Sequence, residues 1–486
     1  MAETLKQIQK NRLQKIEAIK RAGFSAYPVE AKRTHAIGKA IENFDEISKS
    51  QEEISLAGRI KAQRLHGGAL FLDIEDGTGK MQVHLREDRV GEKGFKFFTD
   101  NFDLGDFVQV RGILFITKRG EKTIEAADYK MLAKSLLPLP EKWHGLQDIE
   151  ERFRKRYLDL IFNSDVKKKF QIRSKIIKEI RNFLDSNDFM EVETPILQPL
   201  YGGATAKPFK THLNALDMDL YLRIAPELYL KRLLVGGFEK VYEIGRCFRN
   251  EGMDKSHNPD FTMLEFYWAY ADYKDMMKFT ESMISSVLSK TFGATKIKYE
   301  DKELDFKTPW PRVEYSEILR KHSGINFDEI NLVALKKEAK KMGINPVGGK
   351  AEIADEIFKK VCRPKLIDPV FVINYPAEAF PLAKPLENDP KKSGSFQMIA
   401  NGMEIVKVFT ELNDPVLQRQ RFKEQEAILK KGFEEAQRLD EDFLEALEYG
   451  MPPAAGFGMG IDRLVLLLTN SHAVREIILF PTMRLK

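Results

Sequence analysis

Two short segments of the chain carry side chains whose types and spacing could do chemistry. The first is GRCFRNEG at residues 245–252, which continues through HNPDFT at residues 257–262. Its glycine and proline predict a strand, a loop and a second strand rich in aromatics. Arg249 and Glu251 would then point to the same strand face. Alone, these two could form a structural ion pair and Phe261 could be a core residue, but their combination with a histidine around one loop favours a functional site.

The second segment is GFGMGIDR at residues 456–463, and it runs into an apolar helix. Glycines at alternate positions of a strand remove the side chains from one face, so a flat ligand can approach the backbone. Arg463 then emerges at the start of a helix, where backbone N–H groups and the helix dipole favour an anion. The sequence contains no G-x-x-x-x-G-K-[ST] loop. If the protein uses ATP, it therefore does so without a P-loop.

The elements that must position these segments alternate between helices and strands. Ile176, Ile180 and Leu184 share one helical face, and this helix is predicted to end near residues 186–188. Residues 189–197 then read as a strand whose proline indicates an edge position or an irregular end. Residues 328–362 form a lysine-rich stretch with a helical pattern, which we interpret as an insertion.

The N-terminal part of the chain has the pattern of a small barrel. Short strands are predicted at residues 55–65, 69–74, 80–85, 107–117 and 122–132. Five strands in so short a stretch favour a closed barrel of the OB type, although an SH3-like barrel or a plain meander would look similar. The predicted domains are an N-terminal helical extension at 1–50, the barrel at 51–137, a proline-containing linker at 138–160 and a larger domain at 161–486.

Composition narrows the class of protein. The chain has 486 residues, 43% of them hydrophobic, so two or three domains with buried cores are expected. Its net charge of +5 is only mildly basic and does not prove a nucleic-acid partner. No stretch approaches the ~18 apolar residues of a membrane span, and the N-terminus lacks the apolar segment of a signal peptide. Cys247 and Cys362 are too few for a disulfide framework. We expect a soluble cytoplasmic protein without membrane contact.

Together, these segments resemble a known family. The two chemical segments are similar to motifs 2 and 3 of class II aminoacyl-tRNA synthetases, and residues 189–197 with their helix resemble motif 1, the dimer-forming element. Other stretches resemble lysyl-tRNA synthetases in particular: LPEKWHGL at 139–146, RYLDL at 156–160, LRIAPELYLK at 222–231 and YPAE at 375–378. The resemblance covers nearly the whole chain from the barrel onward and is weakest in residues 1–50 and 328–362.

The resemblance implies an α+β fold, in which an anticodon-gripping OB barrel precedes a catalytic domain with an antiparallel sheet flanked by helices. It implies a homodimeric lysine–tRNA ligase that uses ATP and Mg²⁺. Such an enzyme converts lysine and ATP to lysyl-adenylate and pyrophosphate, then transfers lysine to the 3′ end of tRNA-Lys and releases AMP.

The resemblance also implies roles for individual residues around ATP. Arg249 would meet the α-phosphate and the amino-acid carboxylate, Phe261 would stack on adenine, and Arg463 would reach the γ-phosphate, so the two arginines are the expected catalytic residues. The full expected ATP set is Arg249, Glu251, His257, Asn258, Phe261, Glu404 and Arg463, with Glu404 also the expected metal ligand.

Carboxylates are expected to recognise the two ammonium groups of lysine. By the family pattern Glu227 faces the α-amino group, and Glu411 faces the ε-amino group with help from Tyr267. The full expected lysine set is Gly203, Ala204, Glu227, Arg249, Tyr267 and Glu411. A buried carboxylate facing an ammonium discriminates strongly, because an uncharged analogue leaves it unpaired. Aspartyl and asparaginyl relatives typically have Pro-Gln where this chain has Pro226-Glu227.

On the barrel, Phe71 and Gln82 match positions that contact anticodon uridines in the family, although Phe71 could instead be a barrel core residue. Residues 1–21 read as a basic amphipathic helix, which either packs by its apolar side with its charges in solvent or contacts the tRNA backbone.

The chain departs from the family pattern at three positions. Gln397 stands where a second metal-binding acid is usual, Lys407 where asparagine is usual, and Ser256 where bacterial relatives often have arginine. The first two could compensate one another in charge. Two alternatives stay open: a ligase on the same fold that lysylates a protein, and an RNA-binding paralogue with impaired catalysis, which only Gln397 and Lys407 favour. The barrel argues against the first, and Arg249, Glu251, Phe261 and Arg463 argue against the second.

Overall fold

The computed structural model describes residues 4–140, 148–429 and 438–484. The chain forms two compact units, Met1–Leu146 and Gln147–Lys486. Part of the predicted linker, including most of the LPEKWHGL stretch, lies outside the described residues. The predicted domain bounds stay predictions.

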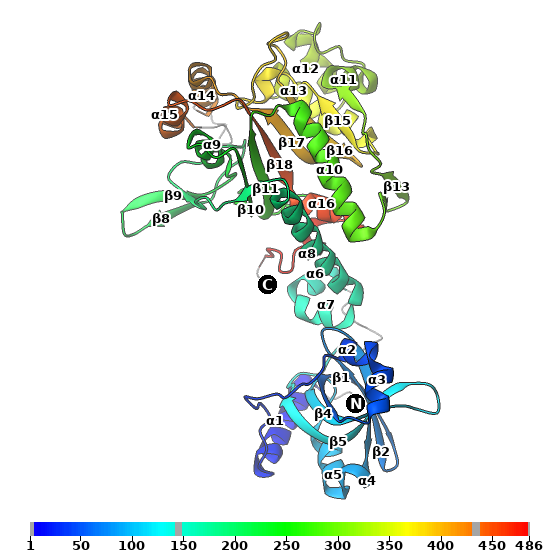
Figure 1. The fold of residues 1–486 in the computed structure, drawn as a ribbon. Coiled ribbons are helices and arrows are strands. Elements are labelled where there is room, and N and C mark those ends of the chain that lie inside the picture. The colour runs from blue at the N-terminus through cyan, green and yellow to red at the C-terminus, as the bar shows by residue number, and fades with distance from the viewer. Residues whose placement is uncertain (1–3, 141–147, 430–437, 485–486) are drawn as a thin grey trace. The chain divides into compact units, whose positions relative to one another are not determined.

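The first unit is built on a closed five-stranded barrel with the strand order β1-β2-β3-β5-β4 (Figure 1). Its strands are β1 (Ile54–His66), β2 (Ala69–Glu75), β3 (Lys80–Arg86), β4 (Phe107–Ile116) and β5 (Lys122–Ala133). These confirm the five predicted strands, and closure excludes the plain meander. In β3 the side chains of Met81, Val83 and Leu85 are buried in the barrel while Gln82 and His84 face outward, as the period of two requires.

Two helices between β3 and β4 were not predicted. They are α4 (Glu87–Val90) and α5 (Glu92–Asn101). Phe95 and Phe98 of α5 belong to the same buried core as the barrel interior. The i, i+3 spacing of these phenylalanines is the helical signal that the strand pattern on either side obscured.

The N-terminal helix α1 (Leu5–Arg21) packs on this unit by its apolar side, where Ile16 and Ile19 join the core. Arg12 is also buried and donates hydrogen bonds to the carbonyls of Ser135 at 3.0 Å and Leu137 at 3.1 Å. The packing interpretation is therefore confirmed. A tRNA contact by the exposed lysines of α1 stays a prediction. The unit also contains α2 (Ile37–Glu42) and α3 (Phe44–Ser50).

The second unit is built on an eight-stranded sheet with the order β14-β15-β16-β17-β18-β11-β10-β6. Its strands are β6 (Met190–Glu191), β10 (Lys240–Phe248), β11 (Asp260–Ala269), β14 (Arg312–Glu314), β15 (Val370–Ile373), β16 (Ser395–Ala400), β17 (Met403–Thr410) and β18 (Ala454–Gly460). The six central strands pair antiparallel, and the two edge strands β6 and β14 pair parallel with their neighbours.

Three helices cover one face of this sheet: α8 (Ser164–Asp185), α10 (Tyr273–Phe292) and α16 (Ile461–Leu468) (Figure 1). The core between them includes Phe266, Val406 and Phe457, which alternate along their strands with residues of the opposite face. As predicted, α8 buries Ile176, Ile180 and Leu184. The opposite face is therefore the one that carries polar side chains.

The strand predicted at residues 189–197 is much shorter than expected. Only Met190–Glu191 pairs with β10, and a second short strand, β7, occupies Leu197–Gln198. Pro195 lies between them and has no N–H to donate to a ladder. β7 instead joins β9 (Met218–Leu222) and β8 (Lys210–Leu213) in a separate three-stranded sheet.

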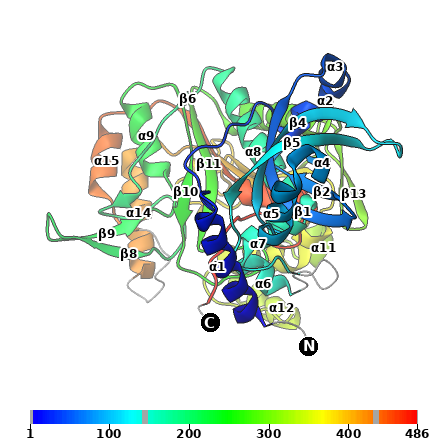
Figure 2. The same cartoon turned by 90° about the horizontal axis from the view of Figure 1, so that it is seen from below.

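Most of the remaining helices lie at the sheet edges, whereas α6 and α7 lie next to the start of α8 (Figure 1). Residues 328–362 are helical as predicted and share a core with α11 and β15, whereas α9, α14 and α15 lie together beside β10 and β11 (Figure 2). The bounds are α6 (Ile149–Arg154), α7 (Arg156–Phe162), α9 (Glu227–Val235), α11 (Tyr315–Ser323), α12 (Leu332–Lys341), α13 (Lys350–Ile357), the π-helix η1 (Phe358–Cys362), α14 (Pro415–Leu429), α15 (Glu441–Glu448) and the hairpin β12 (Lys296–Tyr299) with β13 (Lys302–Asp305). Within the described residues, no helix is both long and apolar enough to cross a membrane.

Candidate active site

The uncovered face of the large sheet carries a row of residues that runs across five strands. Glu243 lies opposite Glu265, Glu265 opposite Gly458, Gly458 opposite Lys407, and Lys407 opposite Gln397. Directly opposed residues of antiparallel strands share a face. The sheet therefore presents carboxylates at one end of the row and a lysine toward the other, with a glycine between them.

A β-bulge brings Glu404 onto the same face. The register of β16 and β17 shifts after Met398 and Val406, so that Glu404 lies opposite Ile399. Without the extra residue in β17, Glu404 would point to the helix-covered side, because side chains alternate along a strand. Bulges commonly re-aim one side chain in this way beside functional sites.

An acidic pocket lies at one end of the row. Glu227 at the start of α9, Glu265 on β11 and Glu411 after β17 are all at most 5% exposed. Lys231, which is 0% exposed, places its Nζ 2.6 Å from Glu227 Oε1 and forms an ion pair with Glu411. The Tyr267 hydroxyl donates a hydrogen bond to Glu265 Oε2 at 3.2 Å. Glu227 and Glu411 thus share one ammonium, while Glu265 bonds to Tyr267 and is influenced by the positive charge of Arg249, so the pocket has an excess of negative charge when all three carboxylates are ionised.

The pKa values of the pocket reflect this shortage of positive charge. Burial, the negative charge of Glu227 and that of Glu411 raise the pKa of Glu265 well above its ordinary value. Burial and Glu227 also raise the pKa of Glu411 to about 8, although the ion pair with Lys231 acts in the opposite direction. Burial acts to lower the pKa of Lys231, but the two carboxylates outweigh it and raise that pKa. Both raised pKa values reflect an excess of negative charge that a bound cation would offset.

Glycines keep this pocket open. A Cβ at Gly456 would overlap the Glu411 carboxylate and lie 2.5 Å from Tyr267 Cε1. Gly203 has a φ of +84°, and a Cβ there would lie 2.8 Å from Glu227 Cβ. Ala204 packs beside it with Tyr201 in a small apolar cluster. The loop before β8 thus closes against the first turn of α9.

A basic group of side chains lies around Glu404. The Arg463 guanidinium donates to the Glu404 carbonyl at 3.1 Å, and its other terminal nitrogen lies 3.1 Å from His257 Nε2. Its distance to the Glu404 carboxylate is 3.8 Å. Burial acts to raise the pKa of Glu404, but the positive charges of Arg463, Lys407, Arg363 and Lys359 lower it. The Glu404 carboxylate therefore lies where three elements meet: the loop between β10 and β11, the bulged strand β17, and α16.

The same loop positions Arg249 and Phe261. The Arg249 guanidinium lies 5.0 Å from the centre of the Phe261 ring, and its buried Nε has no hydrogen-bond partner among the described residues. The loop itself is held by Asp254, which accepts from His257 Nδ1 at 2.8 Å, and by Asn258, which donates to Asp260 at 2.8 Å. Burial acts to raise the pKa of Asp254, but hydrogen bonds from His257 and Ser256 lower it to about 2.

One sequence expectation about this loop is wrong. β10 ends at Phe248, so Arg249 and Glu251 lie in the loop and do not share a strand face. Glu251 is exposed, and its carboxylate has no hydrogen-bond or ion-pair partner within the part of the chain that the structure describes. These two side chains lie in a loop that contains glycine and proline, so the alternation of side chains along a strand does not apply to them.

The residues available to hold a metal are few. Among the described residues, no group of three or more His, Cys, Asp or Glu side chains could hold a metal ion. Gln397, opposite Lys407, already accepts a hydrogen bond from the Tyr375 hydroxyl at 2.8 Å. Magnesium takes oxygen ligands and often uses one or two carboxylates together with phosphates. Glu404 therefore suits a cation that arrives with oxygen ligands of its own.

Comparison with known proteins fits this geometry. Residues 148–484 match the family described as tRNA synthetases class II (D, K and N). The chain belongs to this family. Residues 54–132 match an OB-fold nucleic acid binding domain, so the barrel is of the OB type.

The curated relatives of this synthetase chain are named lysine–tRNA ligases. That of Pelotomaculum thermopropionicum is 49% identical over 99% of this chain and 96% of its own length. The ligase of Clostridium tetani is 47% identical over 98% of this chain and 96% of its own length. The ligase of Aquifex aeolicus is 50% identical over 94% of this chain and 78% of its own length. None of these names supports either alternative, a protein-lysylating ligase or a non-catalytic paralogue.

Two residues of the synthetase site were missed by sequence reasoning, Glu265 and Lys231. Glu265 lies two residues before Tyr267 on the same strand face, so alternation along the predicted strand could have found it. Lys231 lies one helical turn after Glu227, a spacing that places the two side chains together. The signal for their burial is not local, because it depends on β18 and on the segment after β17.

The OB barrel of the synthetase exposes Phe71 rather than burying it. Phe71 is half-buried on the outer face and stacks on His84, with ring centres 4.5 Å apart and planes at 8°. His66 and Phe115 extend this aromatic row. Gln82, on the same face, accepts a hydrogen bond from Thr123 at 3.0 Å. The reading of Phe71 as a barrel core residue is therefore wrong.

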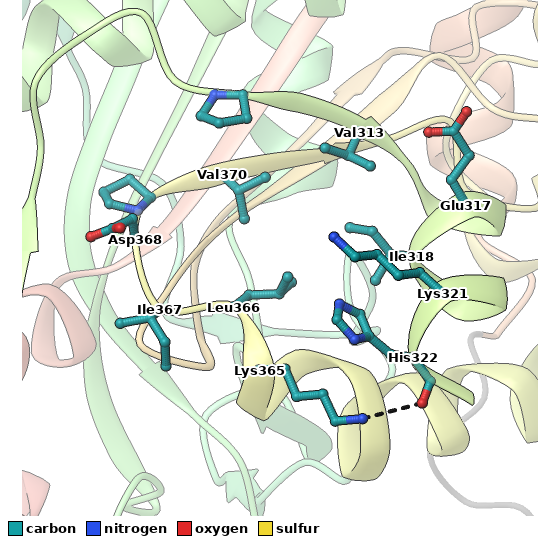
Figure 3. A pocket seen from close by; sticks show the side chains of 12 residues that line it. Val313, Glu317, Ile318, Lys321, His322, Lys365, Leu366, Ile367, Asp368 and Val370 are labelled. Atoms are coloured by element: carbon teal, nitrogen blue, oxygen red, sulfur yellow. Dashed lines mark hydrogen bonds between the residues drawn. The ribbon is translucent and has the colours of Figure 1, made fainter. Parts of the chain in front are cut away.

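A separate cavity of about 380 Å³ lies where η2 (Arg363–Lys365) and β15 meet α11 (Figure 3). Val370 and Ile318 form its apolar wall, and Lys365 donates to the His322 carbonyl at 3.2 Å. None of the predicted site residues lines this cavity. We therefore assign the chemistry to the sheet face and not to this cavity.

Proposed function

We propose that this chain is a lysine–tRNA ligase, which activates lysine with ATP and transfers it to the 3′ end of tRNA-Lys. The observation that carries the proposal is the acidic pocket. Its three buried carboxylates outnumber its one buried ammonium, so the pocket suits a substrate with positively charged groups. Lysine is the protein amino acid that carries two ammonium groups on a flexible chain. The family match and the names of the relatives support the same substrate.

In this proposal Glu227 binds the α-amino group and Glu411 the ε-amino group of lysine. Tyr267, hydrogen-bonded to Glu265, holds the far end of the pocket, and Gly203 and Ala204 form its wall. A neutral analogue such as norleucine would not offset the excess negative charge around Glu411, and leaving a buried charge without compensation costs roughly 3–5 kcal/mol. The pocket thus selects by charge rather than by size alone.

The first reaction step needs alignment and charge neutralisation more than proton transfer. A lysine carboxylate oxygen forms a bond to the α-phosphorus of ATP, while the bond from that phosphorus to the bridging oxygen breaks and pyrophosphate leaves. We assign Arg249 to the α-phosphate and the carboxylate, and Arg463 to the γ-phosphate, with Phe261 stacking on adenine. Each positioned donor at such a charge contributes roughly 10²–10³ in rate.

The other members of the expected ATP set line the same loop. Glu251, His257 and Asn258 are proposed nucleotide contacts, and Glu404 is the proposed ligand of the Mg²⁺ that enters with ATP. When bound, Mg²⁺ neutralises phosphate charge. In the second step the 3′-hydroxyl oxygen of the tRNA attacks the lysyl carbonyl, its proton is lost, and AMP leaves with the electrons of the broken anhydride bond.

The tRNA is proposed to bind through the outer face of the barrel. Phe71 and its neighbours His66, His84 and Phe115 form an aromatic row on which bases can stack. Gln82 lies beside this row and is the proposed hydrogen-bonding partner of an anticodon base. We expect each stacked base to contribute about 1–3 kcal/mol.

A homodimer and a cytoplasmic location complete the proposal. Met190, Ile196 and Leu197, in the segment that resembles the dimer-forming motif, are 52%, 43% and 47% exposed. Three exposed large apolar side chains within eight residues of the chain favour a covered interface. Cys247 and Cys362 are both buried free thiols, which suits a reducing compartment.

Amino-acid-dependent ATP–pyrophosphate exchange, run with each of the twenty amino acids and without tRNA, tests the proposal. We expect exchange with lysine alone. Exchange with another amino acid would mean that the acidic pocket has a different substrate, and no exchange with retained tRNA binding would refute the ligase. Sedimentation of the protein tests the dimer separately.

A further inference from the structure

Lys407 is a cation at the centre of the site face without a carboxylate or hydrogen-bond partner in the described residues. It lies on β17, between Gln397 on β16 and Gly458 on β18. Its Nζ lies 4.0 Å from the centre of the Phe380 ring and 5.3 Å from that of Phe409. Aromatic faces attract an ammonium but leave its N–H groups free to donate. A lysine held in this way is set to bind an anion that comes from outside the chain.

The position of Lys407 places it between the two halves of the site. Gly458 alone separates it in the row from Glu265 of the acidic pocket. Burial lowers the pKa of Lys407, although the carboxylates of Glu404, Asp355 and Glu227 act to raise it. Glu404 belongs to the basic group with Arg463, and Glu227 to the acidic pocket. The Lys407 ammonium therefore lies where the proposed function brings the lysine carboxylate to the α-phosphate.

The charge around Glu404 makes a second metal ion unfavourable. Four cations, Arg463, Lys407, Arg363 and Lys359, act on this one carboxylate, and of these Lys359 also pairs with Asp355 at 2.7 Å. Gln397 offers only a neutral amide oxygen, and the Tyr375 hydroxyl already donates to it. A divalent cation held by the protein alone would meet net positive charge here and few oxygen ligands, whereas Mg²⁺ prefers several.

We propose that Lys407 supplies the positive charge that a protein-held metal ion would otherwise provide. It does so where the lysine carboxylate meets the α-phosphate. The site then uses only the Mg²⁺ that ATP brings. The three N–H donors of the ammonium hold the attacking carboxylate and a phosphate oxygen together, and Lys407 exchanges no proton or covalent bond. This inference rests on the proposed function.

The row across the sheet explains why the neutral residue Gln397 accompanies Lys407. The two are direct cross-strand partners, so a glutamate at 397 would lie opposite the ammonium and pair with it. Such a pair would withdraw Lys407 from the substrate. Gln397 instead hydrogen-bonds to Tyr375 and leaves the ammonium available.

The first experiment counts bound metal and does not depend on turnover. Mn²⁺ binding is measured by electron paramagnetic resonance with α,β-methylene-ATP and lysine present. We expect one Mn²⁺ per nucleotide for the wild type. The double variant Gln397→Glu with Lys407→Asn restores a carboxylate and removes the cation, so it should bind one more. An additional Mn²⁺ in the wild type itself would overturn the inference.

The second experiment measures lysine-dependent exchange as free Mg²⁺ is varied at constant MgATP. Lys407→Met should lower kcat by roughly 10²-fold, with the KM for lysine and for ATP changed less than about threefold, and free Mg²⁺ should partly restore the rate. Lys407→Arg should keep most of the activity because it keeps the charge. The matched control is Lys360→Met, an exposed lysine of η1, which should match the wild type at every Mg²⁺ concentration.

A rate for Lys407→Met within threefold of the wild type at low free Mg²⁺ would refute the inference and leave Lys407 a packing residue on Phe380. If circular dichroism shows that Lys407→Met does not fold, the single variant Gln397→Glu decides, because it leaves the contacts of Lys407 with the aromatic rings in place. Gln397→Glu should slow exchange at low free Mg²⁺. An unchanged rate would refute the inference. A wild type without lysine-dependent exchange would instead overturn the proposed function, while the metal count would still report on Lys407.

Discussion

Glu411 offers a direct test of recognition by charge balance. Its side chain is 0% exposed, forms an ion pair with Lys231, and lies beside Tyr267. In the proposed complex it faces the ε-amino group of lysine. Glu411→Gln keeps the shape of the side chain but removes the carboxylate that can ionise against a bound ammonium, so the pocket offers less negative charge to a substrate with two positive charges.

The size of the effect follows from burial. Removing one partner of a buried ion pair costs roughly 3–5 kcal/mol, because the other charge stays buried and unpaired. Each 1.4 kcal/mol is about tenfold in an equilibrium constant. We therefore expect kcat/KM for lysine to fall by roughly 10²- to 10⁴-fold, mainly through KM, because the ε-amino group is far from the reacting carboxylate.

The assay is ATP–pyrophosphate exchange with lysine and with norleucine, which is similar in length but has no ε-ammonium. Glu411→Gln should lose activity toward lysine while its activity toward norleucine is unchanged or higher. The matched control is Glu424→Gln, an exposed glutamate of α14, which should not change either rate. A fall of less than about fivefold in kcat/KM for lysine would show that Glu411 is not the carboxylate that recognises the substrate.

Three further outcomes are expected. Because burial raises the pKa of Glu411 to about 8, the native state keeps a proton that the unfolded chain loses near pH 4.5. The free energy of unfolding of the wild type should thus fall by up to about 1.4 kcal/mol per pH unit between pH 5 and 8 from this group. Glu411→Gln lacks the titrating group, so its Tm relative to that of the wild type should rise with pH in thermal melts. A Tm difference that does not change with pH would contradict this. Gly456→Ala should lower lysine-dependent exchange by at least roughly 10²-fold with an unchanged circular dichroism spectrum, since its Cβ would overlap Glu411 and Tyr267 and a small displacement of bound groups can cost that much; full activity would mean that the pocket can widen. Phe71→Ala should raise the KM for tRNA by about 5- to 150-fold, the equivalent of 1–3 kcal/mol of stacking, while leaving tRNA-independent exchange unchanged; an equal loss in both assays would indicate a folding defect instead.

The barrel could be predicted from the sequence because its strands are half-buried. One face of each strand meets the core, so residues such as Met81, Val83 and Leu85 alternate with polar ones and mark the strand directly. α5 was not predicted, because a ten-residue helix between two strands offers few turns of its own period. The strand at residues 189–197 was over-predicted because its apolar residues suit a strand, while Pro195 prevents a continuous ladder.

The site was predictable where its chemistry is local and not where it is assembled from distant segments. Arg249, Phe261 and Arg463 belong to short motifs that can be recognised in the sequence alone. The burial of Lys231 depends on Glu411, which is 180 residues away by numbering and meets it only through the packing of α9 against the end of β17. Glu404 faces the site through a single bulge in β17. No local pattern in the sequence contains that register shift.

The distribution of charge along the sheet face bears on how the substrates are oriented. The acidic pocket around Glu227, Glu265 and Glu411 lacks positive charge, and the group around Glu404 has an excess of it. A lysine molecule bound with its ammonium groups in the pocket must direct its carboxylate toward the basic group. A nucleotide bound with its phosphates at the basic group must present the α-phosphate to that carboxylate. The reversed arrangement would place phosphates against buried carboxylates and an ammonium against Arg463, and both contacts are repulsive. In the proposed function, the electrostatics of the face therefore favour the arrangement that brings the lysine carboxylate to the α-phosphate, and Lys407 lies between the acidic pocket and the basic group.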